Sequence, residues 1–189
     1  MRRSITILIA GIFVILTAAL PARAAERVIP PITQPTEYLC DGNGVGDCKS
    51  LPPHGSVVDG ARIFAVARNS GAWRWDVFPD GLVENNFTYP PLNNQLNGQT
   101  IWVLKLHANN NFCNGNSGGA DILKDCSNQV FPPSEQWVLD PSNHYFVNIG
   151  RSNDKDNWEV LCNPGGGGPL VIGTRDSCTT YHEQWNFVS

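Results

Sequence analysis

Apolar and polar residues alternate along most of the chain beyond residue 57, with a period of two. Residues 73–77 read Trp-Arg-Trp-Asp-Val, so that three apolar side chains share one face. Runs with similar alternation lie at 102–106, 145–149, 158–162 and 185–187. Successive side chains of a β-strand point to opposite faces of a sheet, so this period indicates strands. The pattern predicts many short strands.

Turn-forming residues interrupt these runs often. The chain has 18 glycines and 14 prolines, and no segment of useful length has the helical period. Short alternating runs that are separated by Gly and Pro are typical of an all-β domain. We therefore expect an all-β fold.

Two cysteine-bracketed segments near the C-terminus have the same layout. They span 113–126 and 162–178, and each begins Cys-Asn, passes through a Gly-rich turn and a short apolar run, and closes with an Asp near the second Cys. A Gln-Trp pair follows each segment. These pairs are Gln136, Trp137, Gln184 and Trp185. A repeat with a period of roughly 50 residues indicates one supersecondary unit that is used more than once.

The repeat divides the strands into three units, at about 57–104, 105–139 and 140–189. In the first unit, the segment 99–102 (Gln-Thr-Ile-Trp) stands where the later units have Gln-Trp. Three β units around a shared core make a β-trefoil, so we predict a single β-trefoil over 57–189. One tryptophan per unit is expected in the core, where burial contributes roughly 2–3 kcal/mol. The glutamines are expected to satisfy backbone groups of turns.

The N-terminal region has the pattern of a secretory signal peptide. Arg2 and Arg3 precede an uncharged apolar run over 5–20, and Ala22-Arg23-Ala24 fits the small-x-small cleavage rule. We predict a signal peptide over 1–24, cleavage after Ala24, and a secreted or periplasmic protein. The apolar run is shorter than the roughly 20 residues that span a bilayer, and no later segment could span one. Residues 25–56 are rich in Pro and Gly, which predicts an extended arm with a Cys40–Cys48 loop.

Charge and cysteine content narrow the function further. Without the three arginines of the signal peptide, ten basic residues face 17 acidic ones, which disfavours nucleic acid or anionic membranes as partners. The six cysteines lie beyond residue 24 and fit an oxidising compartment. Pairing is open in sequence alone. The repeat favours Cys113–Cys126 and Cys162–Cys178, which leaves Cys40–Cys48. Zinc binding is an alternative, but no Cys-x2-Cys motif is present.

The repeat, with its Cys-Asn start, Asp near the closing Cys and Gln-Trp end, resembles the ricin B-type lectin repeat. The segments 64–68 (Phe-Ala-Val-Ala-Arg), 73–78 (Trp-Arg-Trp-Asp-Val-Phe) and 122–127 (Ile-Leu-Lys-Asp-Cys-Ser) are similar to the A and C subunits of cytolethal distending toxins. That resemblance implies a lectin-like module that carries a nuclease toxin subunit to a host cell, together with a second trefoil subunit. It implies binding rather than catalysis, with no cofactor and no metal.

The resemblance places an aromatic patch on the first unit. The residues that match it are Phe64, Trp73, Trp75 and Phe78. Flat aromatic rings stack on the apolar faces of sugars, and Trp offers a large rigid surface. The alternative is that Trp73 and Trp75 are core residues, since a strand face can turn either way.

The conventional sugar pockets depart from the ricin pattern. Such repeats usually carry an Asp two positions after the first Cys, and here Gly115 and Pro164 stand at that place. The neighbouring Asn114 and Asn163 could hydrogen-bond a sugar hydroxyl but supply no carboxylate. We therefore weigh three functions: a module that binds a host-cell glycan or glycoprotein, a trefoil that docks another exported protein, and a secreted glycoside hydrolase that uses two of the 17 acids.

Overall fold

The described part of the chain is built from β-strands, which confirms the all-β prediction. The computed structural model describes residues 36–41, 46–51, 56–68, 73–83, 95–152, 158–165, 167–178 and 184–188, all of which belong to one compact unit over 32–189. The predicted signal peptide and residues 25–35 of the predicted arm lie outside the described residues. Within the described ranges, no helix is long and apolar enough to cross a membrane.

Twelve strands and two 3₁₀ helices make up this part of the chain. The first unit of four strands consists of β1 (Thr36–Asp41), β2 (Asp47–Ser50), β3 (Phe64–Ala67) and β4 (Trp75–Leu82). The second consists of β5 (Thr100–Leu106), β6 (Asn109–Ser117), β7 (Ala120–Asp125) and β8 (Trp137–Leu139), with η3 (Pro133–Glu135) before β8. The third consists of β9 (Phe146–Asn148), β10 (Glu159–Cys162), β11 (Val171–Thr174) and β12 (Trp185–Val188), with η4 (Arg175–Cys178) after β11.

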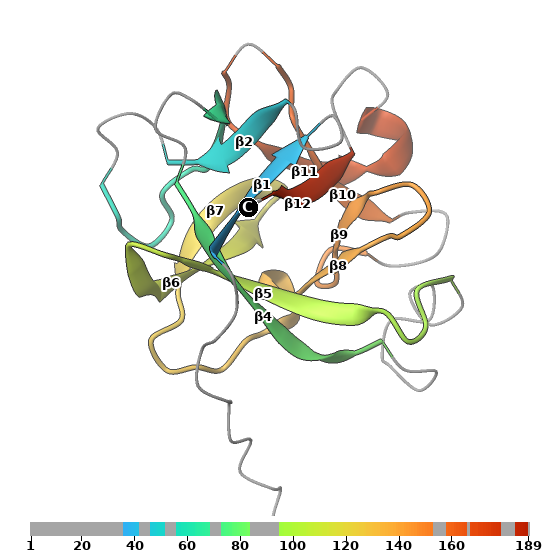
Figure 1. The fold of residues 1–189 in the computed structure, drawn as a ribbon, viewed down its shortest axis with the longest axis horizontal. Helices are drawn as coiled ribbons and strands as arrows, with labels where there is room; N and C mark the ends of the chain where they lie inside the picture. Colours follow the sequence, from blue (N-terminus) through green and yellow to red (C-terminus); the bar gives the residue numbers. More distant parts are fainter. Residues whose placement is uncertain are drawn as a thin grey trace, which may run out of the picture. The chain divides into compact units, whose positions relative to one another are not determined.

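Six strands follow one another in a ring of antiparallel neighbours. β12 pairs with β1, β1 with β4, β4 with β5, β5 with β8, and β8 with β9. A bridge between Tyr145 and Gln184 then joins the segments before β9 and β12, which closes the ring. Figure 1 shows β1 and β12, from opposite ends of the chain, lying side by side. Each unit contributes its first and last strand to this ring.

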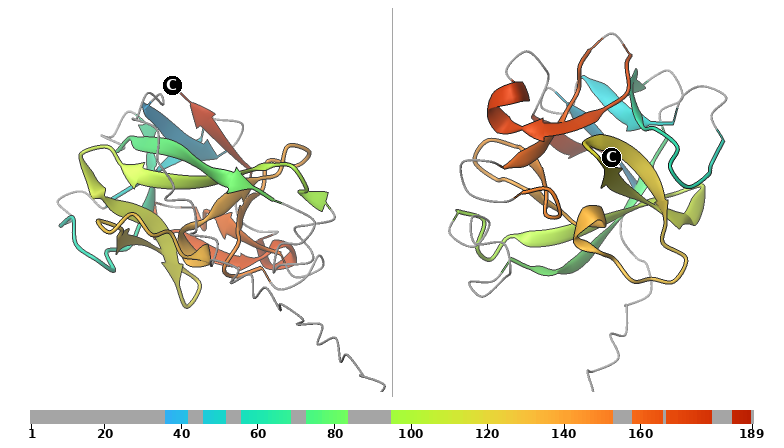
Figure 2. Two further views of the ribbon diagram at one scale, coloured as in Figure 1. Left: turned by 90° about the horizontal axis from the view of Figure 1, so that it is seen from below. Right: turned by 180° about the vertical axis from the view of Figure 1, so that it is seen from behind.

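The two middle strands of each unit pair with each other. These antiparallel pairs are β2–β3, β6–β7 and β10–β11. The three pairs also contact one another, through the bridges Arg62–Ile122 and Phe64–Pro169 and through the β7–β11 pairing at Ala120. The view from behind in Figure 2 shows β6–β7 and β10–β11 on the same side of the molecule. The three hairpin-like pairs therefore meet as a second layer beside the ring.

The first unit begins earlier than the sequence predicted. Residues 36–41 and 47–50, which we placed in an extended arm, form β1 and β2 and pair with β12, β4 and β3. The Cys40–Cys48 bond joins these two strands, where the cysteines face each other. Proline and glycine interrupt the alternation in this region, so the sequence alone did not predict these strands. The pairing partners of β1 are β12 and β4, which come from distant parts of the chain. The other two bonds are Cys113–Cys126 and Cys162–Cys178, so the repeat-based pairing is confirmed.

One tryptophan opens the last strand of each unit and lies fully in the core. Trp75, Trp137 and Trp185 are each 0% exposed. Each indole Nε1 donates to a backbone carbonyl of the third-last strand of its own unit, to Lys49 O at 3.3 Å, Asn114 O at 3.3 Å and Leu161 O at 2.9 Å. A buried indole N–H must find an acceptor, and the repeat of this contact makes the three units equivalent.

This equivalence corrects the motif that we assigned to the first unit. Trp102, which stood where the later units have their Gln-Trp, lies in β5 opposite Trp137 and packs on Phe187 with ring centroids 5.9 Å apart. The counterpart of Trp137 and Trp185 is Trp75. Residue 74, which precedes it, is Arg and not Gln. The Gln-Trp motif was therefore misleading in this unit.

Buried polar contacts join neighbouring units. Asn163 Nδ2 donates to Asp41 Oδ2 at 2.5 Å, which ties the third unit to the first. Asn116 Nδ2 donates to Asn148 Oδ1 at 2.7 Å, which ties the second unit to the third. All four residues are buried, so each contact satisfies groups whose unpaired burial would cost about 1–3 kcal/mol.

We predict that Trp75→Ala destabilises the fold by about 3–5 kcal/mol, as truncation of a large core aromatic does. The loss should equal that of Trp185→Ala within about 1 kcal/mol, since both rings fill the same place in their units. Urea unfolding followed by circular dichroism measures both. Val130→Ala, at a side chain that is 67% exposed, serves as a control and should shift stability by less than about 0.5 kcal/mol. A Trp75→Ala variant as stable as the wild type would contradict a core role for this ring.

Candidate functional site

The predicted aromatic patch does not form as a surface. Trp75 is fully buried and Phe78 is 7% exposed, so neither ring can contact a large ligand. Trp73 and Phe64 are half-buried, and Trp73 packs against the main core. The alternative that we kept open, a core role, therefore holds for Trp75. Both faces of β4 are covered near its start, which the alternation of residues 73–77 could not reveal.

The two asparagines that we offered to a sugar are part of the interior. Asn114 is 0% exposed and Asn163 is 1% exposed. The Asn114 amide contacts Lys49 and Asp121, while Asn163 contacts Asp41 and accepts a bond from the backbone N–H of Gly165. Sugar hydroxyls have no access to either amide, so the prediction of hydrogen bonding there is wrong.

Gly115 lies at a crowded position of β6. A Cβ at this position would lie 2.7 Å from Lys124 Cγ and 3.0 Å from Glu135 Cγ. Contacts below about 3 Å require a neighbour to move, so packing favours glycine here. The place where a ricin-type repeat carries its Asp is filled by other side chains.

The Gln-Trp motifs have divided roles. The tryptophans are core residues, as predicted. Gln136 Nε2 donates to Oδ2 of Asp80, near the end of β4, at 2.6 Å. Its side chain therefore does not bond to the backbone of a turn. Gln184 is exposed, and its backbone forms the bridge to Tyr145. The expectation that the glutamines satisfy turn backbone groups is thus replaced, for Gln136, by a contact between two units.

A surface that the sequence did not single out lies on the first unit. The guanidinium carbons of Arg68 and Arg74 stand 4.9 Å and 4.8 Å from the centroid of the Tyr38 ring. Both arginines are exposed and Tyr38 is half-buried. We call these three residues the Tyr38 platform. A cation over an aromatic face is attracted by the ring quadrupole, so the platform presents two positive charges beside a flat ring.

The Tyr38 platform has a firm base. The Tyr38 ring packs with Val66 and Val188 around the Cys40–Cys48 disulfide. Tyr38 also lies opposite Val188 in the β1–β12 pair. Because strands from both ends of the chain meet under the ring, its position is set by the fold and not by a single loop. An ordered site of this kind loses less entropy on binding.

A histidine extends the polar surface next to Arg74. The backbone N–H of His107 donates to Arg74 O at 3.0 Å, and the His107 Nδ1 lies 2.9 Å from Asp76 Oδ1. The His107 side chain is 56% exposed. Arg74, Asp76 and His107 therefore lie together at the junction of β4 and β5. The sequence signal that could have found the site was the pair of arginines on either side of residues 69–73, of which we noted Arg74 only as the polar residue between two tryptophans.

A buried carboxyl group lies in the second unit. Glu135 is 3% exposed, and its Oε2 has no hydrogen-bond partner. Burial raises the pKa of Glu135 from 4.5 to about 7, with Lys124 opposing the shift and Asp59 and Asp125 adding to it. Glu135 also lies near Cys113 and Cys126. Those sulfurs form a disulfide, so they cannot act as thiolate ligands of a metal.

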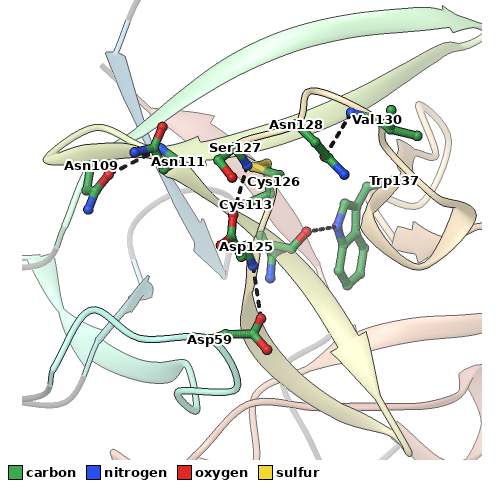
Figure 3. Close-up of a disulfide and its surroundings, with 11 residues drawn as sticks. Asp59, Asn109, Asn111, Cys113, Asp125, Cys126, Ser127, Asn128, Val130 and Trp137 are labelled. Carbon is green, nitrogen blue, oxygen red and sulfur yellow. Dashed lines mark hydrogen bonds between the residues drawn. A yellow bond between two sulfur atoms is a disulfide. The ribbon is translucent and has the colours of Figure 1, made fainter.

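Figure 3 shows what surrounds this disulfide. The Cys113–Cys126 bond joins β6 to the turn after β7, and the indole of Trp137 donates to the backbone of β6 at the residue after Cys113. The N–H of Asp125 donates to Asp59 Oδ1 at 2.9 Å, and Asp125 Oδ1 accepts from the N–H of Ser127 at 2.9 Å. These contacts close the turn after β7 and give no opening toward the disulfide. The surroundings are those of a structural bond.

Comparisons of the chain with protein-family models, with curated proteins and with solved structures found no match in any of the three. The geometry of the described residues is therefore what bears on function.

The raised pKa of Glu135 predicts a pH dependence of stability. Between pH 4.5 and about 7 the unfolded chain releases the Glu135 proton while the folded chain retains it, so this group favours folding less as pH rises. Glu135→Gln keeps the neutral form, and its stability relative to wild type should rise across this window and level off above it. Allowing for solvent screening, we expect a gain of about 1–2 kcal/mol near pH 8.

Urea midpoints of the two proteins at a series of pH values from 4.5 to about 8 measure this difference. Asp176→Asn, at an exposed carboxylate of η4, is the matched control and should give a small, nearly constant difference. A difference between Glu135→Gln and wild type that stays constant across this pH range would contradict a protonated Glu135.

Proposed function

We propose that the protein is an exported β-trefoil that binds an acidic carbohydrate of a host-cell glycan or glycoprotein. The ring of β1, β4, β5, β8, β9 and β12, with the three pairs β2–β3, β6–β7 and β10–β11 beside it, supports the trefoil. So does the threefold repeat of the buried tryptophan contact. Three disulfides are compatible with an extracellular or periplasmic place of action.

The Tyr38 platform is the observation that carries the binding proposal. Guanidinium groups bind carboxylates through two parallel hydrogen bonds, and an aromatic ring under a guanidinium group holds it in place. The Tyr38 ring holds the exposed Arg74 in this way, with Arg68 over the same ring. A sugar that bears a carboxylate can pair with Arg74. A neutral sugar offers no charge to it.

The overall charge makes this local surface more selective. Beyond the predicted signal peptide the chain carries 17 acidic residues against ten basic ones, so an anionic ligand is repelled at long range by most of the molecule. Two adjacent arginines offset that repulsion at one place. Binding is expected to weaken with added salt, since the charges on the platform are exposed and screened.

The wider biological role rests on the resemblance to the A and C subunits of cytolethal distending toxins. In this proposal the module has no catalytic role and delivers a nuclease subunit to the cell surface, in company with a second trefoil subunit. Co-purification of a secreted nuclease with the native protein would support that role. A native protein that is isolated alone, at concentrations where it binds cells, would oppose it.

A module that docks another exported protein is the second candidate. The burial of Asn114 and Asn163 favours it, because these positions of the repeats serve the interior instead of a sugar. The same arginines could then pair with carboxylates of a partner protein. Recovery of a stoichiometric partner from the native secretome, together with no binding to a glycan array, would identify this function.

We predict that the mature protein binds sialylated or uronate-containing glycans on an array and binds cells that display them. The double variant Arg68→Gln/Arg74→Gln should bind at least about 10-fold more weakly, since charged hydrogen bonds contribute about 1.5–3 kcal/mol each. The melting temperature should change little, because both side chains are exposed.

Arg175→Gln is the matched control, since it removes one positive charge from η4, in the third unit. It should retain wild-type binding. Equal binding by the wild type and the double variant would remove the Tyr38 platform as the site. Absence of binding by the wild type to any acidic glycan would reject the carbohydrate proposal and leave the docking module.

A further inference from the structure

Three reactive side chains meet in the core, away from the Tyr38 platform. Lys49 of β2, Asn114 of β6 and Asp121 of β7 are each 0% exposed. Lys49 Nζ lies 2.8 Å from Asn114 Oδ1 and 2.7 Å from Asp121 Oδ2. Asn114 Nδ2 lies 2.5 Å from Asp121 Oδ1. The amine, the carboxamide and the carboxyl group thus form a closed triangle, and every side of it is a hydrogen bond.

Aromatic rings surround this triangle. Lys49 Nζ lies 5.0 Å from the ring centroid of Trp137 and 5.9 Å from those of Trp75 and Phe146. Two of these rings are the tryptophans that open β4 and β8. An ammonium and a carboxylate in such surroundings cost several kcal/mol in lost hydration, and an apolar pair of similar size is often as stable. The fold keeps three polar groups here at a cost.

Burial acts against the charge on both groups of this pair. It lowers the pKa of Lys49 and raises the pKa of Asp121, while their mutual attraction opposes both shifts. Desolvation is the largest cause in each case, so burial disfavours both the ammonium and the carboxylate. A neutral amine is a nucleophile, and a carboxylic acid can protonate a leaving group.

We propose that Lys49 and Asn114 join in an intramolecular isopeptide bond, and that Asp121 carries the proton that this reaction moves. Lys49 Nζ attacks Asn114 Cγ, so that a carbon–nitrogen bond forms. The bond from Cγ to Nδ2 breaks, and Nδ2 leaves as ammonia. The products are one secondary amide and one ammonia molecule, and neither an oxidant nor a reductant is required.

The position of Asp121 matches this role. Its Oδ2 accepts from the attacking nitrogen and its Oδ1 accepts from the nitrogen that leaves. One carboxyl group can therefore take a proton from Lys49 and give a proton to the departing Nδ2. Lys49 Nζ lies 2.8 Å from Asn114 Oδ1, the oxygen that is bonded to Cγ, so the amine stands beside the carbonyl group that it attacks.

The bond would join two units covalently, which none of the three disulfides does. Cys40–Cys48 lies within the first unit, Cys113–Cys126 within the second and Cys162–Cys178 within the third. A bond between Lys49 and Asn114 joins residues 65 positions apart and ties the first unit to the second. It also removes the buried ammonium, which leaves Asp121 as a neutral donor to the new amide.

The mass of the intact mature protein tests the proposal. The protein is reduced so that the three disulfides are open, its N-terminus is fixed by peptide mapping, and the mass is compared with that of the sequence. We expect a deficit of one ammonia. A full sequence mass would overturn the proposal, and a deficit of one water would overturn Asn114 as the partner, since that result assigns the bond to Asp121.

Tryptic mapping identifies the linkage itself. An acylated Lys49 is no longer a trypsin site, so residues 28–62 should appear joined to residues 106–124 in one branched peptide. This step also separates the proposal from ring closure at Asn114-Gly115, which loses the same ammonia but leaves Lys49 free. Linear peptides that end at Lys49, found with the ammonia deficit, would overturn the proposal.

Asp121→Asn is the variant that probes the proton carrier. It keeps the size of the side chain, but its amide cannot carry the proton, so its mass should equal its full sequence. Lys105→Met is the matched control, because it removes another buried lysine, and it should retain the deficit of one ammonia. An Asp121→Asn protein with the branched peptide at wild-type yield would overturn the assignment of Asp121. The wild-type mass tests the bond even where a variant fails to fold.

Discussion

The contact between a buried indole N–H and a backbone carbonyl holds each unit of this protein together. Trp75, Trp137 and Trp185 open the last strand of their units and reach the third-last strand through Nε1. The indole ring fills the space between the six-strand ring and the three hairpin-like pairs. Its N–H fixes its orientation. Without an acceptor, the buried donor would cost about 1–3 kcal/mol. The three contacts therefore set the spacing between the two layers.

Polar groups in the interior follow from that spacing. The strands of neighbouring units approach closely where Asp41 meets Asn163 and where Asn116 meets Asn148. In the first and second units the corresponding region holds Lys49, Asn114 and Asp121. Each of these groups is satisfied by another unit or by a neighbouring strand. Burial thus converts residues that look like ligand contacts in the sequence into contacts between units.

Core packing decides which side chains of the first unit are available on the surface. The rings of Trp75 and Phe78 are packed inside, and the position of the usual repeat carboxylate is filled around Gly115. Among the described residues of the first unit, Arg68 and Arg74 are exposed and lie over the half-buried Tyr38 ring. It is supported by β1, β12 and the Cys40–Cys48 disulfide. The proposed binding surface therefore rests on positive charge held over an aromatic ring, and not on the pockets of the repeats.

Local pattern predicted the strands beyond residue 57, the repeat and the disulfide pairing, because alternation and cysteine spacing are features of one unit of the chain. Trp137 and Trp185 could be assigned to the core from the repeat alone. Trp75 could not, since no Gln marks it and either face of its strand could turn inward. The strands β1 and β2 were hidden for a similar reason, because their partners β12 and β4 come from distant parts of the chain. Only the tertiary structure brings Lys49 to Asn114 and Arg68 to Tyr38, since neighbours in space that are far apart in sequence leave no periodic signal.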